Sequence, residues 1–164
     1  MPIGIACLYS LFPPQNAKKR GKKLEQVLNE LFRIYGIQIR EAFSRNEEEC
    51  KGTVEQIDGV IELDGEIYLV EMKWKEVPVD VNDVSRHLVR IYHRGYTRAI
   101  FISAGKYSDA AVKTCKEALQ KTVIVLSTLE EIVKVLEQKQ HIAKFLKEKI
   151  HIAILDKEPL AFID

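Results

Sequence analysis

The sequence has few cysteines and no long hydrophobic run, and both absences narrow the classes of protein to consider. Its three cysteines are odd in number and widely spaced, with no CxxC pair, which indicates reduced thiols rather than a disulfide framework or a zinc site. The four histidines show no metal-ligand spacing either. The apolar segment 1–12 lacks a basic stretch, is too short to span a bilayer and runs into two prolines. We therefore expect a cytoplasmic protein with no membrane partner.

The chain also lacks a strong charge of one sign, since its net charge is +1 over 164 residues. Hydrophobic residues make up 46% and charged residues 30%, which is ordinary for a globular protein. Net charge therefore does not decide whether nucleic acid is a partner. The length suits one domain over residues 1–164, with a core of about residues 17–127 and a C-terminal helical extension over 128–164.

Hydrophobic periodicity predicts elements in the order α-β-β-β-α-β-α-β-α. This order favours an α/β sandwich whose mixed central sheet combines an antiparallel hairpin with parallel crossover strands. It corresponds to an αβββαβ core followed by C-terminal αβα additions. The expected elements are a helix over 24–36, a strand over 37–43, a loop over 44–52, a hairpin over 53–74, a helix over 81–95, a strand over 98–103, a helix over 108–121, a strand over 122–126 and a last helix over 128–151.

The turn of the predicted hairpin is the strongest local signal. Asp64-Gly65 separates two runs rich in β-branched residues, 53–63 and 66–74. Asp-Gly is typical of a type I′ turn, because that turn needs positive φ at both central residues. A two-residue turn also sets the register, so that Leu63 pairs with Glu66 and every pair further from the turn follows.

The same register brings two carboxylates face to face. It places Asp58 opposite Glu71 and Gln56 opposite Lys73. Cross-strand partners have Cβ atoms about 5 Å apart, and like charges at that separation repel. We therefore expect a divalent cation between Asp58 and Glu71. The alternative is a solvated β surface that carries a lysine–carboxylate pair.

Several short motifs surround this pair in a definite order along the chain. They are Gly21-x-x-Leu24-Glu25, Glu55-Gln56-Ile57-Asp58-Gly59-Val60, Glu71-Met72-Lys73, and Ile100-Phe101-Ile102-Ser103 followed by Tyr107-Ser108-x-Ala110. In their order and spacing, over residues 21–127, the chain resembles the PD-(D/E)XK nuclease superfamily, most closely the Mrr-like (type IV) restriction endonuclease catalytic domain. Ile57 stands where the superfamily's name has a proline, a departure that many members share. The resemblance implies a restriction-endonuclease-like fold and Mg²⁺-dependent hydrolysis of phosphodiester bonds in DNA.

Phosphodiester hydrolysis requires an activated water and neutralisation of developing negative charge, and a Mg²⁺ ion held by carboxylates supplies both. Asp58 and Glu71 are the predicted ligands, with the backbone carbonyl of Met72 as a third. Mn²⁺ is expected to replace Mg²⁺. By the resemblance, Glu25 would order metal-bound water from the first helix; the alternative is an ordinary exposed helix glutamate.

Lys73 shares the predicted site with the two carboxylates. A lysine beside carboxylates and phosphates should stay protonated. We therefore interpret it as a residue that positions the attacking water and stabilises charge, rather than as the general base the family assigns. Gln56 would hold the water or the lysine through hydrogen bonds.

Three arginines on one face predict a DNA-contacting ridge in the helix over 81–95. Arg86, Arg90 and Arg94 follow one another at intervals of four, opposite the apolar stripe, and no acidic residue occurs over 87–98. The alternative is a solvated helix face. In the basic cluster over 18–23, Lys22 and Lys23 could contact DNA in the same way, and a flexible basic lead-in to the first helix is an equally good account.

The apolar residues after residue 128 follow a near-heptad pattern that is interrupted at Lys139. Such a stripe more often packs on its own sheet. A helix as long as the pattern would nevertheless outrun a domain of this size, which favours a homodimer through the C-terminal helix.

The residues together predict a metal-dependent DNA endonuclease. One alternative is a structure-selective nuclease that resembles archaeal Holliday junction resolvases, and another is a non-cutting DNA-binding or assembly subunit. No separate recognition domain is expected, so any sequence selectivity would come from loops or from a partner of unknown identity.

Overall fold

The structure is a computed structural model that describes residues 3–13, 16–41, 43–46 and 53–163. Its elements are α1 (Ile3–Tyr9), α2 (Ala17–Ile34), β1 (Gln38–Arg40), β2 (Phe43–Asn46), β3 (Thr53–Ile57), β4 (Gly59–Leu63), β5 (Glu66–Lys73), α3 (Val81–His93), β6 (Arg98–Ser103), α4 (Asp109–Ala118), β7 (Ile124–Thr128), α5 (Leu129–Glu137) and α6 (Ile142–Leu155).

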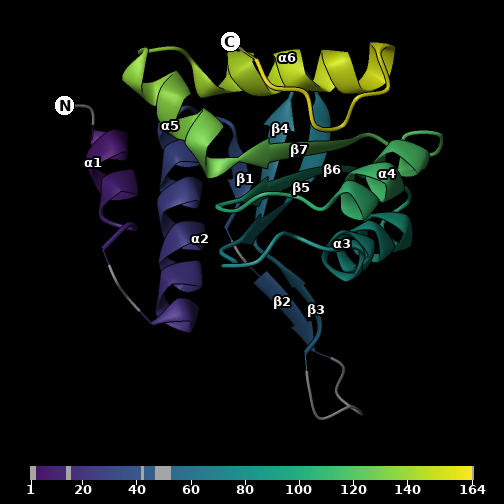
Figure 1. Ribbon diagram of the computed structural model, residues 1–164, viewed down its shortest axis with the longest axis horizontal. Helices are drawn as coiled ribbons and strands as arrows, with labels where there is room; N and C mark the ends of the chain where they lie inside the picture. The colour runs from purple at the N-terminus through teal and green to yellow at the C-terminus, as the bar shows by residue number, and fades with distance from the viewer. Residues whose placement is uncertain (1–2, 14–15, 42, 47–52, 164) are drawn as a thin grey trace.

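A five-stranded mixed sheet forms the centre of the molecule, in the order β1-β4-β5-β6-β7. β1, β4 and β5 are antiparallel neighbours, whereas β5, β6 and β7 run parallel. Figure 1 shows α2 on one side of the sheet and α3 with α4 on the other. The predicted α/β sandwich with a mixed sheet is therefore confirmed. No helix in the described ranges is both long and apolar enough to cross a membrane.

The predicted hairpin register is confirmed from the turn back to Gly59, the first residue of β4. The ladder runs from the pair Leu63–Glu66 to the pair Gly59–Val70. Asp64 and Gly65 have φ values of 53° and 79°, the positive φ that a type I′ turn requires at both central positions. Local chemistry at the turn thus sets which residues of β5 lie beside the end of β4.

Beyond Gly59 the predicted pairing is wrong, because the expected long strand over 53–63 breaks at Asp58. β3 leaves the central sheet and pairs with β2 in a separate two-stranded sheet, so Gln56 lies opposite Ser44 and not opposite Lys73. The part of the predicted loop over 44–46 is strand, and residues 47–52 lie outside the described residues. Figure 1 shows this small sheet extending away from the central one.

Side-chain caps begin several of the helices where the sequence predicts them. Thr128 and Glu131 form a capping box at the start of α5, where the last helix is predicted to begin, and Asp80 and Asp83 form a second one at the start of α3. Ser108 caps α4 through the backbone N–H of Ala111. These contacts are local in sequence, which is why the motifs alone locate them.

The single long helix predicted over 128–151 is wrong. The chain forms two helices, α5 and α6, and Lys139 between them has a φ of 55°. The turn folds α6 back beside α5 and across the sheet (Figure 1). The six residues of the near-heptad stripe are all buried inside the chain: Leu129, Ile132, Leu136, Ala143, Leu146 and Ile150. They are therefore not available as a dimer interface.

A buried ion pair ties α6 to α5 and to the C-terminal segment. Lys149 is 1% exposed, and its Nζ donates to Glu131 Oε1 and to the carbonyl of Ala161, each at 2.7 Å. The other carboxylate oxygen of Glu131 accepts from the N–H of Thr128 at 2.9 Å. Because both partners are bonded on several sides, this pair holds the C-terminal part of the chain in place.

Candidate active site

Asp58 occupies the break between β3 and β4 and is nearly enclosed, with 4% of its surface exposed. Its Oδ2 accepts from the backbone N–H of Met72 at 2.9 Å, so the carboxylate reaches β5 although its backbone has left the ladder. Gln56 Nε2 lies 3.5 Å from Oδ1, at the limit of a hydrogen bond. Gln56 therefore contacts Asp58 as a sequence neighbour and not as the predicted partner of Lys73.

Glu71, near the C-terminal end of β5, is 5% exposed. Its Oε2 accepts from Arg90 Nη1 at 2.6 Å, and its Oε1 lies 3.7 Å from Lys73 Nζ. The alternative of a solvated β surface is therefore wrong for this part of β5. A buried carboxylate needs such compensating charges, because its desolvation is costly.

Two residues for which the sequence predicts no role, His87 and Asn29, pack against the site. His87 on α3 is fully buried, and its Nε2 lies 3.2 Å from the backbone carbonyl of Leu69. A carbonyl only accepts, so we assign the ring proton to Nε2. Nδ1, which lies 3.8 Å from Glu71 Oε2, then carries a lone pair and has no hydrogen-bond partner among the described residues.

The pKa of His87 is lowered to about 3, first by burial and then by the charge of Arg90, so the ring is neutral at physiological pH. It cannot act as a counter-ion for Glu71. A sequence signal for its burial exists: His87 stands three residues after Val84 and four before Ile91, inside the apolar stripe of α3.

Asn29 on α2 is the second unassigned residue, and it fixes the backbone at Asp58. Its Nδ2 donates to the backbone carbonyls of Asp58 at 2.8 Å and Glu25 at 2.9 Å, while its Oδ1 accepts from Gln38 at 3.1 Å. A Cβ at Gly59 would lie 2.7 Å from Asn29 Oδ1, so this close approach requires glycine. Asn29 stands four residues after Glu25, on the same face of α2.

Glu25 on α2 is half-buried and lies near enough to Asp58 and Glu71 for their charges to act on it. Burial raises its pKa to about 7, and the charges of Asp58 and Glu71 contribute to the increase. A cavity of about 300 Å³ is lined by Glu25, Lys22 and Asn29, so solvent can reach this carboxyl group. Glu25 is thus not fully exposed, while its predicted role in ordering metal-bound water stays a prediction.

Burial raises the pKa of all three carboxyl groups, and for Glu25 and Asp58 a neighbouring carboxylate adds to the increase. Burial raises the pKa of Asp58 to about 7, with the charge of Glu71 as the second cause. Burial also raises the pKa of Glu71, although Arg90 and Lys73 act in the opposite direction. Perturbed acids gathered at one place are typical of functional sites.

The donor set has the chemistry for a hard divalent cation. Asp58 and Glu71 each use one carboxylate oxygen in a short hydrogen bond. The other oxygen of each carboxylate makes only the long contacts given above to the described residues. Oxygen ligands of this kind suit Mg²⁺ or Mn²⁺. Within the described ranges, no group of three or more His, Cys, Asp or Glu side chains is arranged to hold a metal ion, so binding by Asp58, Glu71 and the Met72 carbonyl stays a prediction.

The three arginines predicted to form a ridge on α3 lie in different environments. Arg86 is exposed and lies 3.3 Å from Asp83, three residues earlier on the helix. Arg90 turns to the carboxylate of Glu71, and its side chain is 24% exposed. Arg94 is the C-cap residue of α3, and its N–H bonds the carbonyl of Ile91. Arg90 therefore belongs to the candidate active site, whereas its contact with DNA stays a prediction.

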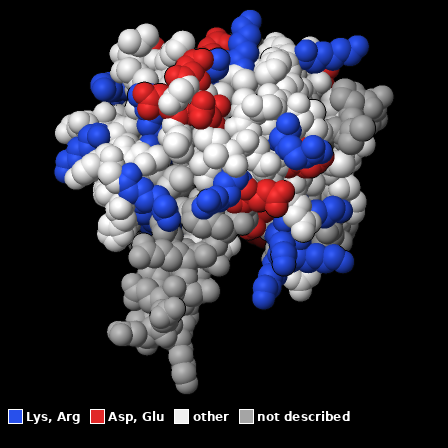
Figure 2. All heavy atoms as spheres, turned by 180° about the vertical axis from the view of Figure 1, so that it is seen from behind, with Lys and Arg blue, Asp and Glu red and all other residues white. Residues whose placement is uncertain are grey.

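The basic cluster over 18–23 forms the first turns of α2, so the flexible lead-in is wrong. Lys22 is exposed and lines the cavity beside Glu25. Lys23 Nζ donates to the backbone carbonyl of Ser10 at 3.2 Å, which ties α2 to the segment after α1. On the face shown in Figure 2, acidic side chains are interspersed among the lysines and arginines, in agreement with the small net charge.

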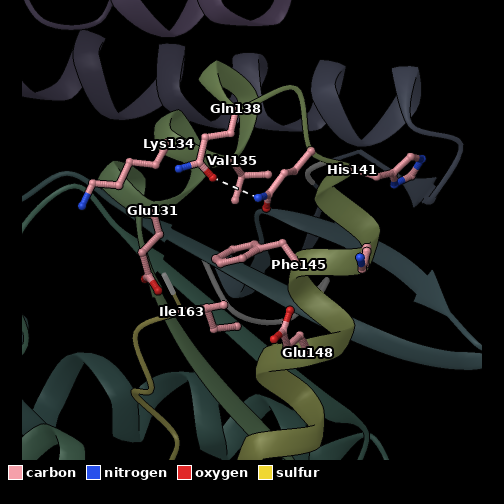
Figure 3. A pocket seen from close by; sticks show the side chains of 10 residues that line it. Glu131, Lys134, Val135, Gln138, His141, Phe145, Glu148 and Ile163 are labelled. Atoms are coloured by element: carbon pink, nitrogen blue, oxygen red, sulfur yellow. Dashed lines mark hydrogen bonds between the residues drawn. The ribbon is translucent and has the colours of Figure 1, made fainter.

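A second cavity, of about 560 Å³, lies between α5 and α6 (Figure 3). Phe145, Glu148 and Ile163 are among its lining residues, and Gln140 donates to Gln138 across its rim. Neither Asp58 nor Glu71 lines it, and Glu25 does not line it either. The candidate active site at the end of β5 is therefore separate from this cavity.

Comparisons with known proteins agree with the geometry. A family model described as a restriction endonuclease, Mrr_cat, matches residues 17–136. No curated protein matches the chain. Among solved structures, the DNA modification-dependent restriction endonuclease AspBHI has a TM-score of 0.50 and 17% identity, over 92% of this chain and 39% of that one. A protein of unknown function, AF1548, has a TM-score of 0.46 and 21% identity, over 76% of this chain and 64% of that one. The chain thus spans less than two thirds of either structure.

Proposed function

Because the chain belongs to the Mrr_cat restriction endonuclease family, we propose that it is a metal-dependent endonuclease that hydrolyses phosphodiester bonds in DNA. The observation that carries the proposal is the burial of two acids at one end of β5: Asp58, which is bound to the N–H of Met72, and Glu71, which lies beside Lys73 and Arg90. Burying two carboxylates costs folding free energy, and buried acids with raised pKa values are typical of functional sites.

The cation would be held by Asp58, Glu71 and the backbone carbonyl of Met72. When bound, a Mg²⁺ or Mn²⁺ ion would make a water more acidic and would neutralise charge on the phosphate. Asn29 would keep the Asp58 backbone in place through its hydrogen bond to the Asp58 carbonyl. These contacts supply the preorganisation that a catalytic centre needs.

The remaining polar residues would act on water and on the phosphate. Lys73, next to Glu71, would donate hydrogen bonds to the attacking water or to a phosphate oxygen. Gln56 would orient water beside Asp58, and Glu25 would accept hydrogen bonds from water on the α2 side. The exposed cations Arg86 and Lys22, with Arg94, would contact the DNA backbone.

The C-terminal part of the chain supports a single nuclease unit. α5 and α6 both pack on β7, and the stripe predicted to form a dimer is buried within the same chain. This removes the dimer argument for the reading as a junction resolvase. A non-cutting subunit is disfavoured because Asp58, Glu71 and Lys73 are brought together in one place.

The proposal is tested by incubating the full chain with plasmid DNA, a linear duplex and a four-way junction, each with Mg²⁺, Mn²⁺ or a chelator. We expect metal-dependent cleavage that is lost in Asp58→Asn, Glu71→Gln and Lys73→Met. The matched control is Glu62→Gln, which replaces an exposed carboxylate of β4 on the same hairpin and should cut at the wild-type rate. Cleavage that survives the chelator, or that persists in all three variants while circular dichroism is native, would refute the assignment.

A further inference from the structure

Arg90 places a positive charge beside Glu71, which is a proposed ligand of the divalent cation. Its Nη1 donates to Glu71 Oε2 at 2.6 Å, and this is its one hydrogen-bond acceptor among the described residues. The nearest ring nitrogen of His87 lies 3.8 Å from the same oxygen, beyond hydrogen-bond distance. Without metal, the negative charge of Glu71 is therefore balanced mainly by Arg90, because Lys73 lies further away.

A divalent cation at Asp58 and Glu71 would lie beside this guanidinium group. The two positive charges repel, and both use the negative charge of Glu71. Formally, Asp58 and Glu71 are balanced by Lys73 and Arg90, and Glu25 is balanced by Lys22, which lines the same cavity. A divalent cation would therefore add positive charge to the site, and one phosphodiester of DNA would offset part of that charge. Metal and phosphate thus complement each other at this site.

The environment of Arg90 differs from that of a purely structural ion pair. Lys149 is almost fully buried and is held by both Glu131 and the Ala161 carbonyl. Arg90 is 24% exposed and lies one helical turn from the exposed Arg86. A long side chain in this position can exchange its acceptor for one in solvent by a change of rotamer.

We infer that Arg90 is a positioning residue that leaves Glu71 for a backbone phosphate when DNA binds, so that DNA and the divalent cation bind cooperatively. The inference rests on the proposed function. Its consequence is that DNA raises the metal affinity, and that metal raises the DNA affinity by the same factor. The protein would then hold its catalytic metal weakly until DNA is present.

The test measures free Mn²⁺ by electron paramagnetic resonance in titrations of the full chain, without DNA and with a duplex whose phosphorothioate linkages keep the charge and resist cleavage. Mn²⁺ bound by the duplex alone is subtracted. In the wild type we expect the duplex to raise the Mn²⁺ affinity about tenfold or more, within the usual range of coupling between two sites.

Arg90→Gln should bind Mn²⁺ about tenfold more tightly than the wild type without DNA, and the duplex should add little. Arg90→Lys keeps a positive charge beside Glu71 and should bind Mn²⁺ like the wild type without DNA. Arg98→Gln, which changes an arginine of similar exposure that pairs with Glu66 at the start of β5, should keep the wild-type metal affinity and the same coupling factor. For a marginally folded variant, the Mn²⁺-induced increase in Tm gives a second readout, and it should be larger in Arg90→Gln than in the wild type.

The direction in which the Mn²⁺ affinity changes in Arg90→Gln tests the inference. Weaker or unchanged Mn²⁺ binding in Arg90→Gln would mean that Arg90 merely orients Glu71, and full coupling retained in that variant would overturn the inference equally. The same tightening in Arg90→Lys would show that charge is not the cause. If the variants give any of these results while the wild type still cuts DNA in the presence of metal, the role of Arg90 is refuted and the proposed function stands. A wild type that binds no Mn²⁺ would overturn the proposed function and this inference together.

Discussion

Asp58→Asn should make the metal-free protein more stable while it removes cleavage. Asp58 is 4% exposed, and burial together with Glu71 raises its pKa to about 7, from 3.8 when it is unperturbed. Asparagine has nearly the same size, and its Oδ1 can still accept from the N–H of Met72. The substitution therefore removes a charge and leaves the main hydrogen bond in place.

The size of the effect follows from the pKa difference between the folded and unfolded chains. At about 1.4 kcal/mol per pKa unit, holding Asp58 ionised in the fold costs roughly 4 kcal/mol above neutral pH. This figure is an upper limit, because side chains and solvent relax around the charge. We expect about 1–3 kcal/mol in the free energy of unfolding, or roughly 3–10 °C in Tm for a chain of this size.

The pH dependence has a definite sign. Between the unfolded pKa near 4 and the folded pKa of about 7, the folded wild type holds a proton on Asp58 that the unfolded chain has released. Raising the pH through this window therefore destabilises the wild type relative to the variant. The difference in Tm should be largest at pH 8 and should shrink steadily as the pH falls toward 4.

Thermal melting followed by circular dichroism at several pH values, with and without millimolar Mg²⁺ or Mn²⁺, provides the assay. Metal should stabilise the wild type by about 1–3 kcal/mol, as mass action gives for a weak site, and should barely change the variant. The control Asp64→Asn alters an exposed aspartate in the hairpin turn, where asparagine is equally suited, and should show neither effect. An Asp58→Asn protein that is less stable at pH 8 and keeps the full metal-induced shift would refute the reasoning.

Three further predictions test separate parts of the structure. Gly59→Ala should lower the free energy of unfolding by about 1–3 kcal/mol and reduce cleavage, because its Cβ would lie 2.7 Å from a side-chain oxygen; in Gly21→Ala, a helical position with nothing within 4 Å, Tm should rise with a gain of about 0.4–1 kcal/mol. Lys149→Ala should destabilise the protein by about 3–5 kcal/mol in urea denaturation, because it leaves a buried carboxylate unpaired, and a loss below 1 kcal/mol would contradict the structural role. Replacing Arg86 and Arg94 together by glutamine should weaken DNA binding and reduce the slope of log K against log salt by up to about 1.8, and an unchanged slope would show that these side chains do not contact phosphates.

The sequence by itself determined the features whose causes are local. Asp64-Gly65 dictates positive φ and hence the register up to Gly59, and Thr128 with Glu131 dictates the start of α5. Hydrophobic periodicity determined the order of most elements, because burial of one face imposes a period of 2 on strands and 3.6 on helices. Conformational preferences of this kind act over a few residues, so they are readable before the chain folds.

Only the tertiary structure decided what Asp58 and Glu71 contact. Where the strand breaks at Asp58, Asn29 from another element donates a hydrogen bond to its backbone carbonyl. Arg90 lies on Glu71 rather than in a purely solvent-facing ridge, since burial of that carboxylate requires a counter-ion. The turn at Lys139 likewise folds α6 onto the sheet, because its apolar stripe is buried there within the same chain. These outcomes depend on contacts between residues far apart in the sequence, whose energies no local pattern contains.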